Sequence, residues 1–561
     1  MLGSVAVSAT LATSLLCRVL AGPIRPRVDT VNTAFVDLGY EIHEGYANDT
    51  GGYYLFSNVA YAVQPVGDLR FKQTRLPTDT RGSPPLRNST GSETVQCVQA
   101  FPQWVVDTRA QHYGVSPQVA ESMLRSQAGQ TESCLVLDVY APAFAVHKNK
   151  NNKNEQDAVP VVVWIHGGGF TYGSKTSTGN PAGLISRAGQ DGIVFVAINY
   201  RLGLYGWLGS GDGTTVPNLG LYDQLLALDW VQKYIGHFGG DPAQVTVLGE
   251  SAGASSLLHH ITARGGEGPA PPFQRAVLQS PAFQFNLDPA VGYREALAAA
   301  ANVTGRPVGS AADLLRLSGA DLAQVNQKAV VTARYGEFNF GPVVDGTYVP
   351  RLPQVLLGRG QFHRTVALMT GHNTAEGVPF VPPTVATPAD AAAAVHASLP
   401  EASDATVAFL VGTLYPAAAY ATPLDQVAQM ETDAALGACT TRFAALASAN
   451  ATYNYLFAVP PAWHGEDTAY TFFNGDTSPV DGVAVAAGLA HALQDAIVAF
   501  AVAADPGKGP AAGGPGTVGF PLYGPEAQVW RLGSEGAAVV RDDMDNPRCP
   551  WWQQAMADGL V

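Results

Sequence analysis

The chain has 561 residues, of which 47% are hydrophobic and 14% are charged, a composition typical of a well-packed globular protein and unlike that of a disordered or coiled one. Its formal net charge of −14 argues against nucleic acid and anionic membrane surfaces as partners. The length would allow several domains, although large α/β enzymes often form one. The sequence shows no internal repeat.

The first 21 residues are apolar and rich in small side chains, and they end in Val19-Leu20-Ala21, which resembles a signal-peptidase site. The segment lacks the usual basic start, and Arg18 comes late in it. Because the apolar stretch is too short to span a membrane, we interpret residues 1–21 as a cleaved signal peptide. The longest later apolar stretch, residues 483–504, contains polar side chains and is predicted to be a helix packed in the core, so we expect no membrane insertion.

The cysteines and glycosylation sequons support export. Removal of the signal peptide removes Cys17 and leaves an even number of cysteines, which fits an oxidising compartment and allows three pairings of Cys97, Cys134, Cys439 and Cys549. Four N-x-[ST] sequons are candidate glycosylation sites: Asn48, Asn88, Asn302 and Asn450. The sequence therefore predicts a secreted glycoprotein.

The first part of the mature chain is broken into short elements. Residues 33–62 alternate between apolar and polar side chains around a turn and predict a small antiparallel sheet. The stretch between Cys97 and Cys134 contains an amphipathic helical pattern at residues 117–126, and would form a tethered flap if these cysteines pair. A strand is expected at residues 135–140, and the polar residues 148–157 are interpreted as a solvated hairpin tip.

The remainder alternates between apolar strands and helices, which indicates a mostly parallel sheet covered on both faces. A helix is expected at residues 218–235, and further strands at residues 161–165, 193–200, 245–248, 276–279, 366–370 and 452–457. Two Ala-rich regions, residues 288–333 and 382–449, are predicted to be helical insertions over the carboxyl edge of the sheet. Residues 506–525 are rich in Gly and Pro and predict a surface loop.

One stretch carries a specific chemical signal. The strand at residues 245–248 runs directly into Gly249-Glu250-Ser251-Ala252-Gly253, and a helical segment follows. A strand, G-x-S-x-G and a helix together form a nucleophile elbow, which holds a serine on a sharp turn above the sheet. Glycine is abundant in the chain, but this is its only G-x-S-x-G match. The start of the new helix points free N–H groups toward an oxyanion at that serine.

An elbow serine needs a base, and the base needs an acid that follows the serine in the chain. His464 lies in a loop after a predicted strand, whereas His396 and His491 sit in Ala-rich helices, where a structural histidine is the default. Glu376 follows the strand at residues 366–370, and strand-end position alone leaves the choice between it and its rivals open. These rivals are Asp345, which has the surroundings of a turn residue, and Asp467, which comes after His464.

A third element of the same chemistry is His166-Gly167-Gly168-Gly169-Phe170, at the end of the strand at residues 161–165. Consecutive glycines allow backbone N–H groups to approach a substrate, as in the oxyanion-hole element that accompanies the elbow.

Together these motifs resemble the type-B carboxylesterase/lipase family, the cholinesterase-like group that includes secreted fungal members. The resemblance covers roughly residue 30 to the end, and its matching positions are 56, 61–62, 65–67, 69–71, 132–135, 166–170, 199–201, 238–242, 249–253, 278–280, 371, 376–377, 464–465 and 548–551. It implies an α/β-hydrolase fold, with residues 22–561 as a single domain that needs no cofactor or metal.

The resemblance also implies residue roles. The positions of Ser251, Glu376 and His464 form the catalytic triad in that family, and the N–H groups at the positions of Gly168, Gly169 and Ala252 form the oxyanion hole. Relatives pair the cysteines at the positions of Cys97 with Cys134, and of Cys439 with Cys549.

The expected activity is hydrolysis of small-molecule carboxylic esters through an acyl-enzyme intermediate. It should fall as the pH drops through the pKa of His464, expected near the usual ~6.5. Alternatives are a lid-gated triacylglycerol lipase, an ester hydrolase or acyltransferase that tailors a secreted metabolite, and a non-catalytic interaction module. The sequence does not identify the ester or the oligomeric state.

Overall fold

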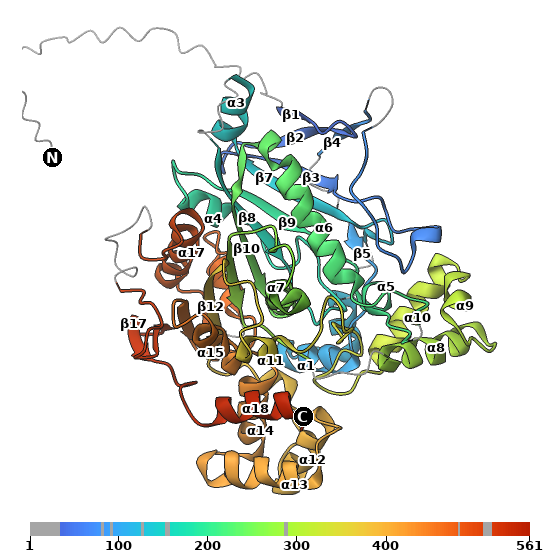
Figure 1. Ribbon diagram of the computed structural model, residues 1–561, viewed down its shortest axis with the longest axis vertical. Helices are drawn as coiled ribbons and strands as arrows, with labels where there is room; N and C mark the ends of the chain where they lie inside the picture. The colour runs from blue at the N-terminus through green and yellow to red at the C-terminus, as the bar shows by residue number, and fades with distance from the viewer. Residues whose placement is uncertain are drawn as a thin grey trace, which may run out of the picture.

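Figure 1 shows the computed structural model, which describes residues 34–79, 84–89, 94–124, 128–151, 158–211, 213–284, 290–480, 483–508 and 519–560. The signal peptide predicted at residues 1–21 lies outside this range, as do parts of the polar stretch at 148–157 and of the loop at 506–525.

In the described part of the chain, a sheet of 13 strands has the order β1-β2-β3-β7-β9-β8-β10-β11-β12-β13-β16-β17, with β4 paired to β2. From β9 to β16 all neighbours are parallel, and antiparallel strands flank this centre on both sides. The strands are β1 (Ala34–Asp37), β2 (Ile42–Asn48), β3 (Tyr53–Ala60), β4 (Leu86–Asn88), β7 (Val136–Pro142), β8 (Val159–Ile165), β9 (Val194–Ile198), β10 (Gly240–Glu250), β11 (Arg275–Gln279), β12 (Ala367–Asn373), β13 (Tyr453–Ala458), β16 (Gln528–Gly533) and β17 (Gly536–Arg541). Two short pairs are separate from it: β5 (Gln96–Cys97) with β6 (Gln130–Thr131), and β14 (Pro479–Val480) with β15 (Val483–Ala484).

Both faces of the sheet are buried, as the continuous apolar strands predict. Along β8, Val161, Val163 and Ile165 belong to one hydrophobic cluster, which includes residues of helix α6. The alternate side chains Val162 and Trp164 belong to a second cluster, which includes residues of α4 and α17. The period of two along the strand thus divides its side chains between two helical layers.

The helices of the described chain cover these faces and build the region around the site. They are α1 (Gln103–Tyr113), α2 (Pro117–Leu124), α3 (Ala143–Asn151), α4 (Ala182–Arg187), α5 (Gly203–Trp207), α6 (Leu219–Tyr234), α7 (Ala252–Ile261), α8 (Ala290–Thr304), α9 (Ala311–Leu315), α10 (Gly319–Val331), α11 (Pro353–Gly358), α12 (Pro388–Ser398), α13 (Asp404–Phe409), α14 (Pro423–Ala434), α15 (Ala438–Ala447), α16 (Asp467–Thr471), α17 (Ala487–Ala503) and α18 (Arg548–Asp558). The two Ala-rich insertions form α8–α10 and α12–α15, and Figure 1 shows α8–α10 and α12–α14 far from the amino-terminal strands β1 and β2.

Most predicted helices and strands are present, with ends shifted by a few residues. Two predictions differ from the structure: one small sheet is part of the main sheet, and one predicted hairpin tip begins as a helix. The antiparallel strands near the amino terminus, β1 to β3, extend the main sheet through the β3–β7 pair. The start of the polar stretch expected to be a hairpin tip, residues 148–151, instead ends α3, because the helix is anchored by the buried side chains of Ala145 and Val146.

Candidate active site

The nucleophile elbow has the local structure that its sequence predicts. β10 ends at Glu250, α7 begins at Ala252, and Ser251 between them has φ 53° and ψ −122°, a strained backbone for a residue with a side chain. A Cβ on Gly253 would lie 2.0 Å from the carbonyl oxygen of Ile165, so α7 can pack this closely on β8 only with glycine there.

Three side chains from distant parts of the chain meet at this turn. His464 Nε2 lies 2.8 Å from Ser251 Oγ, and His464 Nδ1 lies 2.5 Å from Glu376 Oε2. Ser251 and His464 are nearly buried and Glu376 is fully buried. Since Nδ1 donates to the carboxylate, Nε2 is the nitrogen that can accept the serine proton.

The acid of this set is held by its own partners. Glu376 Oε1 accepts hydrogen bonds of 2.5 Å from Ser280 Oγ and from the backbone N–H of Asn373. Asn373 also donates through Nδ2 to the carbonyl oxygen of Trp463, next to His464. These bonds fix the carboxylate and join the loop after β12 to the loop after β13.

Two further acids surround the imidazole. Glu250 Oε1 lies 3.4 Å from His464 Nε2, and the buried Asp467 accepts from Tyr455 Oη and Gln279 Nε2. Burial lowers the pKa of His464, but the charge and hydrogen bond of Glu376, with Glu250 and Asp467, outweigh it and raise this pKa to about 9. Burial raises the pKa of Glu250 to about 8. The histidine pKa is therefore above the usual value expected from the sequence.

The rival residues lie in other surroundings. Asp345 accepts from Asn218 Nδ2 and from the N–H groups of Thr347 and Val349, which makes it a turn residue. His396 is on α12 beside Asp404 with 46% of its side chain exposed. His491 is on α17 against the ring of Phe473. Asp467, the closest rival, contributes to the charge around His464 without binding either of its ring nitrogens in the described contacts.

The glycine-rich loop after β8 reaches the same place. Gly168 and Gly169 have φ values of 103° and 56°, and a Cβ on Gly169 would lie 2.2 Å from the ring of Phe338. Ala252 is the first residue of α7, where the helix leaves its N–H groups without intrahelical acceptors. Gly169, Ala252 and Ser251 line one cavity, so donors and nucleophile share access to it.

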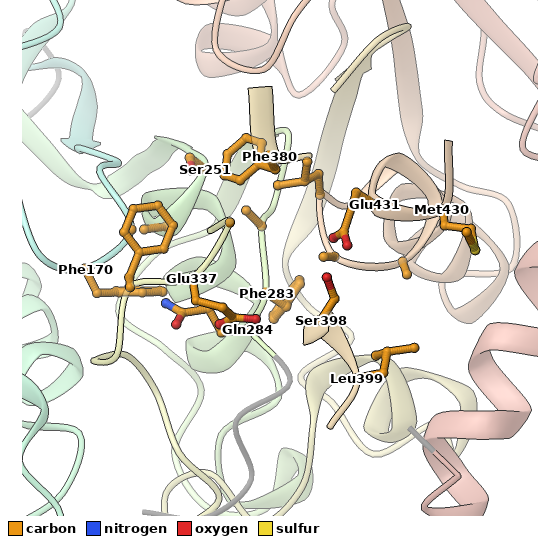
Figure 2. A pocket seen from close by; sticks show the side chains of 18 of the residues that line it. Phe170, Ser251, Phe283, Gln284, Glu337, Phe380, Ser398, Leu399, Met430 and Glu431 are labelled. Atoms are coloured by element: carbon orange, nitrogen blue, oxygen red, sulfur yellow. The ribbon is translucent and has the colours of Figure 1, made fainter. Parts of the chain in front are cut away.

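That cavity has an empty volume of about 780 Å³ including its mouth, and Figure 2 shows its lining. Its walls are mostly apolar and aromatic, with Phe170, Phe283 and Phe380 among them. Glu337 and Glu431 stand out as acids in this lining, away from Ser251 (Figure 2). A mostly apolar cavity with a few polar groups is the usual form of a small-molecule site.

Comparison with known proteins identifies the family. The carboxylesterase family model matches residues 39–552. The chain belongs to the carboxylesterase family.

Its relatives include carboxylesterase patB of Aspergillus clavatus, 34% identical over 93% of this chain and 96% of the relative, and carboxylesterase patB of Penicillium expansum, 34% identical over 92% and 95%. Among solved structures, EstA of Aspergillus niger superposes with a TM-score of 0.76 at 23% identity, covering 94% of this chain and 99% of EstA. The fold is therefore that of the α/β-hydrolases, as predicted, and this family member is a carboxylic ester hydrolase.

The two disulfides that the resemblance implied are present, Cys97–Cys134 and Cys439–Cys549. The first closes the flap that contains α1 and α2. On α1, Trp104 packs against Phe338 and Phe380 and donates from Nε1 to the carbonyl oxygen of Glu337, so this carboxylesterase flap is anchored to the cavity wall.

Glycosylation of the four sequons is still a prediction. The side chains of Asn88 and Asn302 are exposed and therefore accessible to modification, whereas those of Asn48 and Asn450 are partly buried. No helix in the described residues combines the length and apolarity that crossing a membrane requires.

His372, Asp542 and Asp543 place potential metal-ligand atoms within 4.8 Å of one another. The oxygens of Asp542 already accept from Tyr523 and Met544, so hydrogen bonds of the protein account for that residue.

Sequence reasoning missed several residues of this site. Glu250 lies inside the elbow motif, and its place beside the serine was the available signal. Ser280 was among the family-like positions but had no assigned role. Glu337 and Glu431 lie in segments without a motif, so no pattern pointed to them.

Proposed function

We propose that this carboxylesterase is a secreted serine hydrolase that cleaves small-molecule esters through Ser251, His464 and Glu376. The observation that carries the proposal is the position of the His464 imidazole, 2.8 Å from the serine oxygen on one side and 2.5 Å from the buried carboxylate on the other. A base within hydrogen-bonding distance of a nucleophile, itself oriented by a third group, is the arrangement that acyl transfer requires.

In the first half of the reaction, Ser251 Oγ attacks the ester carbonyl while its proton moves to His464 Nε2. The N–H groups of Gly168, Gly169 and Ala252 stabilise the oxyanion that forms; one such donor is worth about 3–4 kcal/mol in other hydrolases. The imidazolium then gives its proton to the departing alkoxide, which leaves an ester between Ser251 and the acyl group.

In the second half, water donates a proton to the neutral His464 and attacks the acyl-enzyme. The proton returns to Ser251 as the acid departs. Throughout, Glu376 keeps Nδ1 protonated and stabilises the imidazolium. Ser280 and Asn373 support this role, since their hydrogen bonds hold the other carboxylate oxygen.

The decisive experiment is Ser251→Ala, assayed with 4-nitrophenyl hexanoate and labelled with a fluorophosphonate. We expect turnover to fall by about 10⁴–10⁶-fold and labelling to be lost, because both depend on the serine oxygen. Retained hydrolysis would exclude the assignment. A wild-type protein that neither hydrolyses esters nor takes up the label would instead support the non-catalytic alternative.

Export is the second part of the proposal. It is supported by the disulfides Cys97–Cys134 and Cys439–Cys549, since such bonds persist in oxidising compartments. We expect the protein in the culture medium of a native-like host to begin at residue 22 and to lose mass on treatment with an N-glycosidase. An intact amino terminus found in the cell fraction would contradict it.

A further inference from the structure

The far wall of the active-site cavity has an unusual composition. The lining includes Glu337 and Glu431, and it includes no lysine, arginine or histidine among the described residues. The rest is mostly hydrocarbon and aromatic, and Ser251 lines the same cavity. Acids are costly in such surroundings unless a partner satisfies them. A hydrocarbon ligand would offer no partner.

Figure 2 shows how these groups lie. In this view Glu337 and Gln284 lie toward one side of the cavity, and Glu431 lies toward the other, where Ser398 hydrogen-bonds to it. Each acid is fixed by its backbone: Trp104 Nε1 donates to the Glu337 carbonyl, and Glu431 lies within α14. Both acids thus lie on held backbone and belong to the cavity lining.

The charge of Glu431 acts on the carboxyl group of Glu337. Burial raises the pKa of Glu337 to about 7, with a further rise from Glu431 and an opposing effect of Arg334. Burial also raises the pKa of Glu431, opposed by a hydrogen bond from Ser398. Near neutral pH, Glu337 can thus donate as well as accept a hydrogen bond.

We propose that Glu337 and Glu431 form a specificity pair, which selects esters that carry a hydroxyl group on the part of the substrate remote from the scissile carbonyl. A hydroxyl both donates and accepts, and so matches a partly protonated pair, whereas an ammonium group only donates and a carboxylate is repelled. An alkyl chain in the same position desolvates both acids and offers neither of them a hydrogen bond. The pair therefore favours hydroxylated esters over long-chain lipids.

This inference rests on the proposed function, and its test compares substrates in one active site. The acyl series consists of the 4-nitrophenyl esters of hexanoic and octanoic acid, with their ω-hydroxy, ω-ammonium and ω-carboxylate derivatives. The alcohol series compares hexyl butanoate with the monobutanoate of 1,6-hexanediol. In at least one series we expect kcat/KM to be about tenfold higher for the hydroxylated ester than for the alkyl ester, from one hydrogen bond to an acid.

Variants identify the source of the preference. Glu337→Met and Glu431→Met should bring the ratio of kcat/KM between hydroxylated and alkyl esters to about one, because each variant removes the acid that bonds the hydroxyl group. Glu337→Gln and Glu431→Gln test the same pair if the Met variants do not fold. Because an amide still donates and accepts hydrogen bonds, these variants should keep most of the preference for hydroxylated esters. Because the amide is uncharged, they should hydrolyse the ω-carboxylate ester at pH 8 better than the wild type does. Glu295→Met, an exposed position on α8, is the matched control and should keep the wild-type ratios.

The outcomes are distinct. Equal kcat/KM for hydroxylated and alkyl esters in both series would overturn the specificity pair and leave the esterase function intact. A preference for the ω-ammonium ester above the hydroxylated one would also overturn it and indicate a cation site. Failure of the wild type to hydrolyse any of these esters, or retained activity in Ser251→Ala, would reject the proposed function itself.

Discussion

The two ends of the active-site cavity are built in different ways. At the Ser251 end, four neighbouring strands of the sheet supply the side chains: Ser251 follows β10, Ser280 follows β11, Glu376 follows β12 and His464 follows β13. Parallel strands end at one edge, so their hydrogen bonds fix the relative positions of these residues.

At the other end, the acids come from outside the sheet. Glu337 lies between α10 and α11, and Glu431 lies on α14. Their separation depends on how the insertions pack over the sheet and on the contact between Trp104 and Phe338. In the proposed function the chemistry therefore belongs to the sheet, while substrate selection belongs to the helices and can change without disturbing the sheet.

The strongest test of the sheet end is the pair His464→Ala and His396→Ala. We expect His464→Ala to reduce kcat by about 10⁴–10⁶-fold, because the serine loses its base. His396→Ala should change kcat by less than about threefold, because a half-exposed side chain on α12 is replaced. Hydrolysis of 4-nitrophenyl hexanoate by both variants measures this. Similar losses in the two would refute the strand-end assignment.

A smaller loss is expected at the acid. Glu376→Gln should reduce kcat by about 10²–10⁴-fold, since the amide can favour the wrong imidazole tautomer while the fold is kept. Asp345→Asn is the control, because Asp345 caps a turn and makes no described contact with Ser251, His464 or Glu376, so kcat should stay within about threefold. Circular dichroism would establish that both are folded. If Asp345→Asn were the more damaging change, the roles of the two acids would have to be exchanged.

The same contrast explains what the sequence could predict. The elbow and the glycine-rich loop are recognisable in the sequence because their geometry permits only certain residues. Gly253, for example, approaches Ile165 so closely that only glycine fits there. The parallel core was predictable because β8 is apolar on both faces. Strand-end position alone left Glu376 among several acids, and the family resemblance selected it.

Other features depend on contacts between distant segments and leave no pattern. The pKa of His464 is raised because three nearby acids, Glu376, Glu250 and Asp467, outweigh the lowering effect of burial. Spacing along the chain cannot reveal that these acids meet around the ring. The start of the polar stretch at 148–151 is helical because the residues before it are buried against the core. Glu337 and Glu431 lie 94 positions apart, and only packing brings them into one cavity.

The smallest expected effect concerns the pH profile. His464 must be neutral to accept the serine proton, so kcat/KM should fall as the pH drops through its raised pKa, and the acidic limb should lie above the usual ~6.5. Glu250 faces His464 Nε2 at 3.4 Å, and Glu376 and Asp467 supply the other negative charges around the ring. In Glu250→Gln one of these charges is gone, the imidazolium is less stabilised, and the limb should move to lower pH by roughly half to one unit.

Profiles of kcat/KM from pH 5 to 10 for wild type, Glu250→Gln and the exposed control Glu295→Gln measure this shift. Glu250 and His464 titrate as a pair, so the limb belongs to both groups and the comparison with the variant is more informative than either profile alone. The control should superpose on the wild type. A limb that moved to higher pH in Glu250→Gln would mean that Glu250 does not stabilise the protonated histidine. The negative charge that raises the pKa of His464 would then have to come from Glu376 and Asp467 alone.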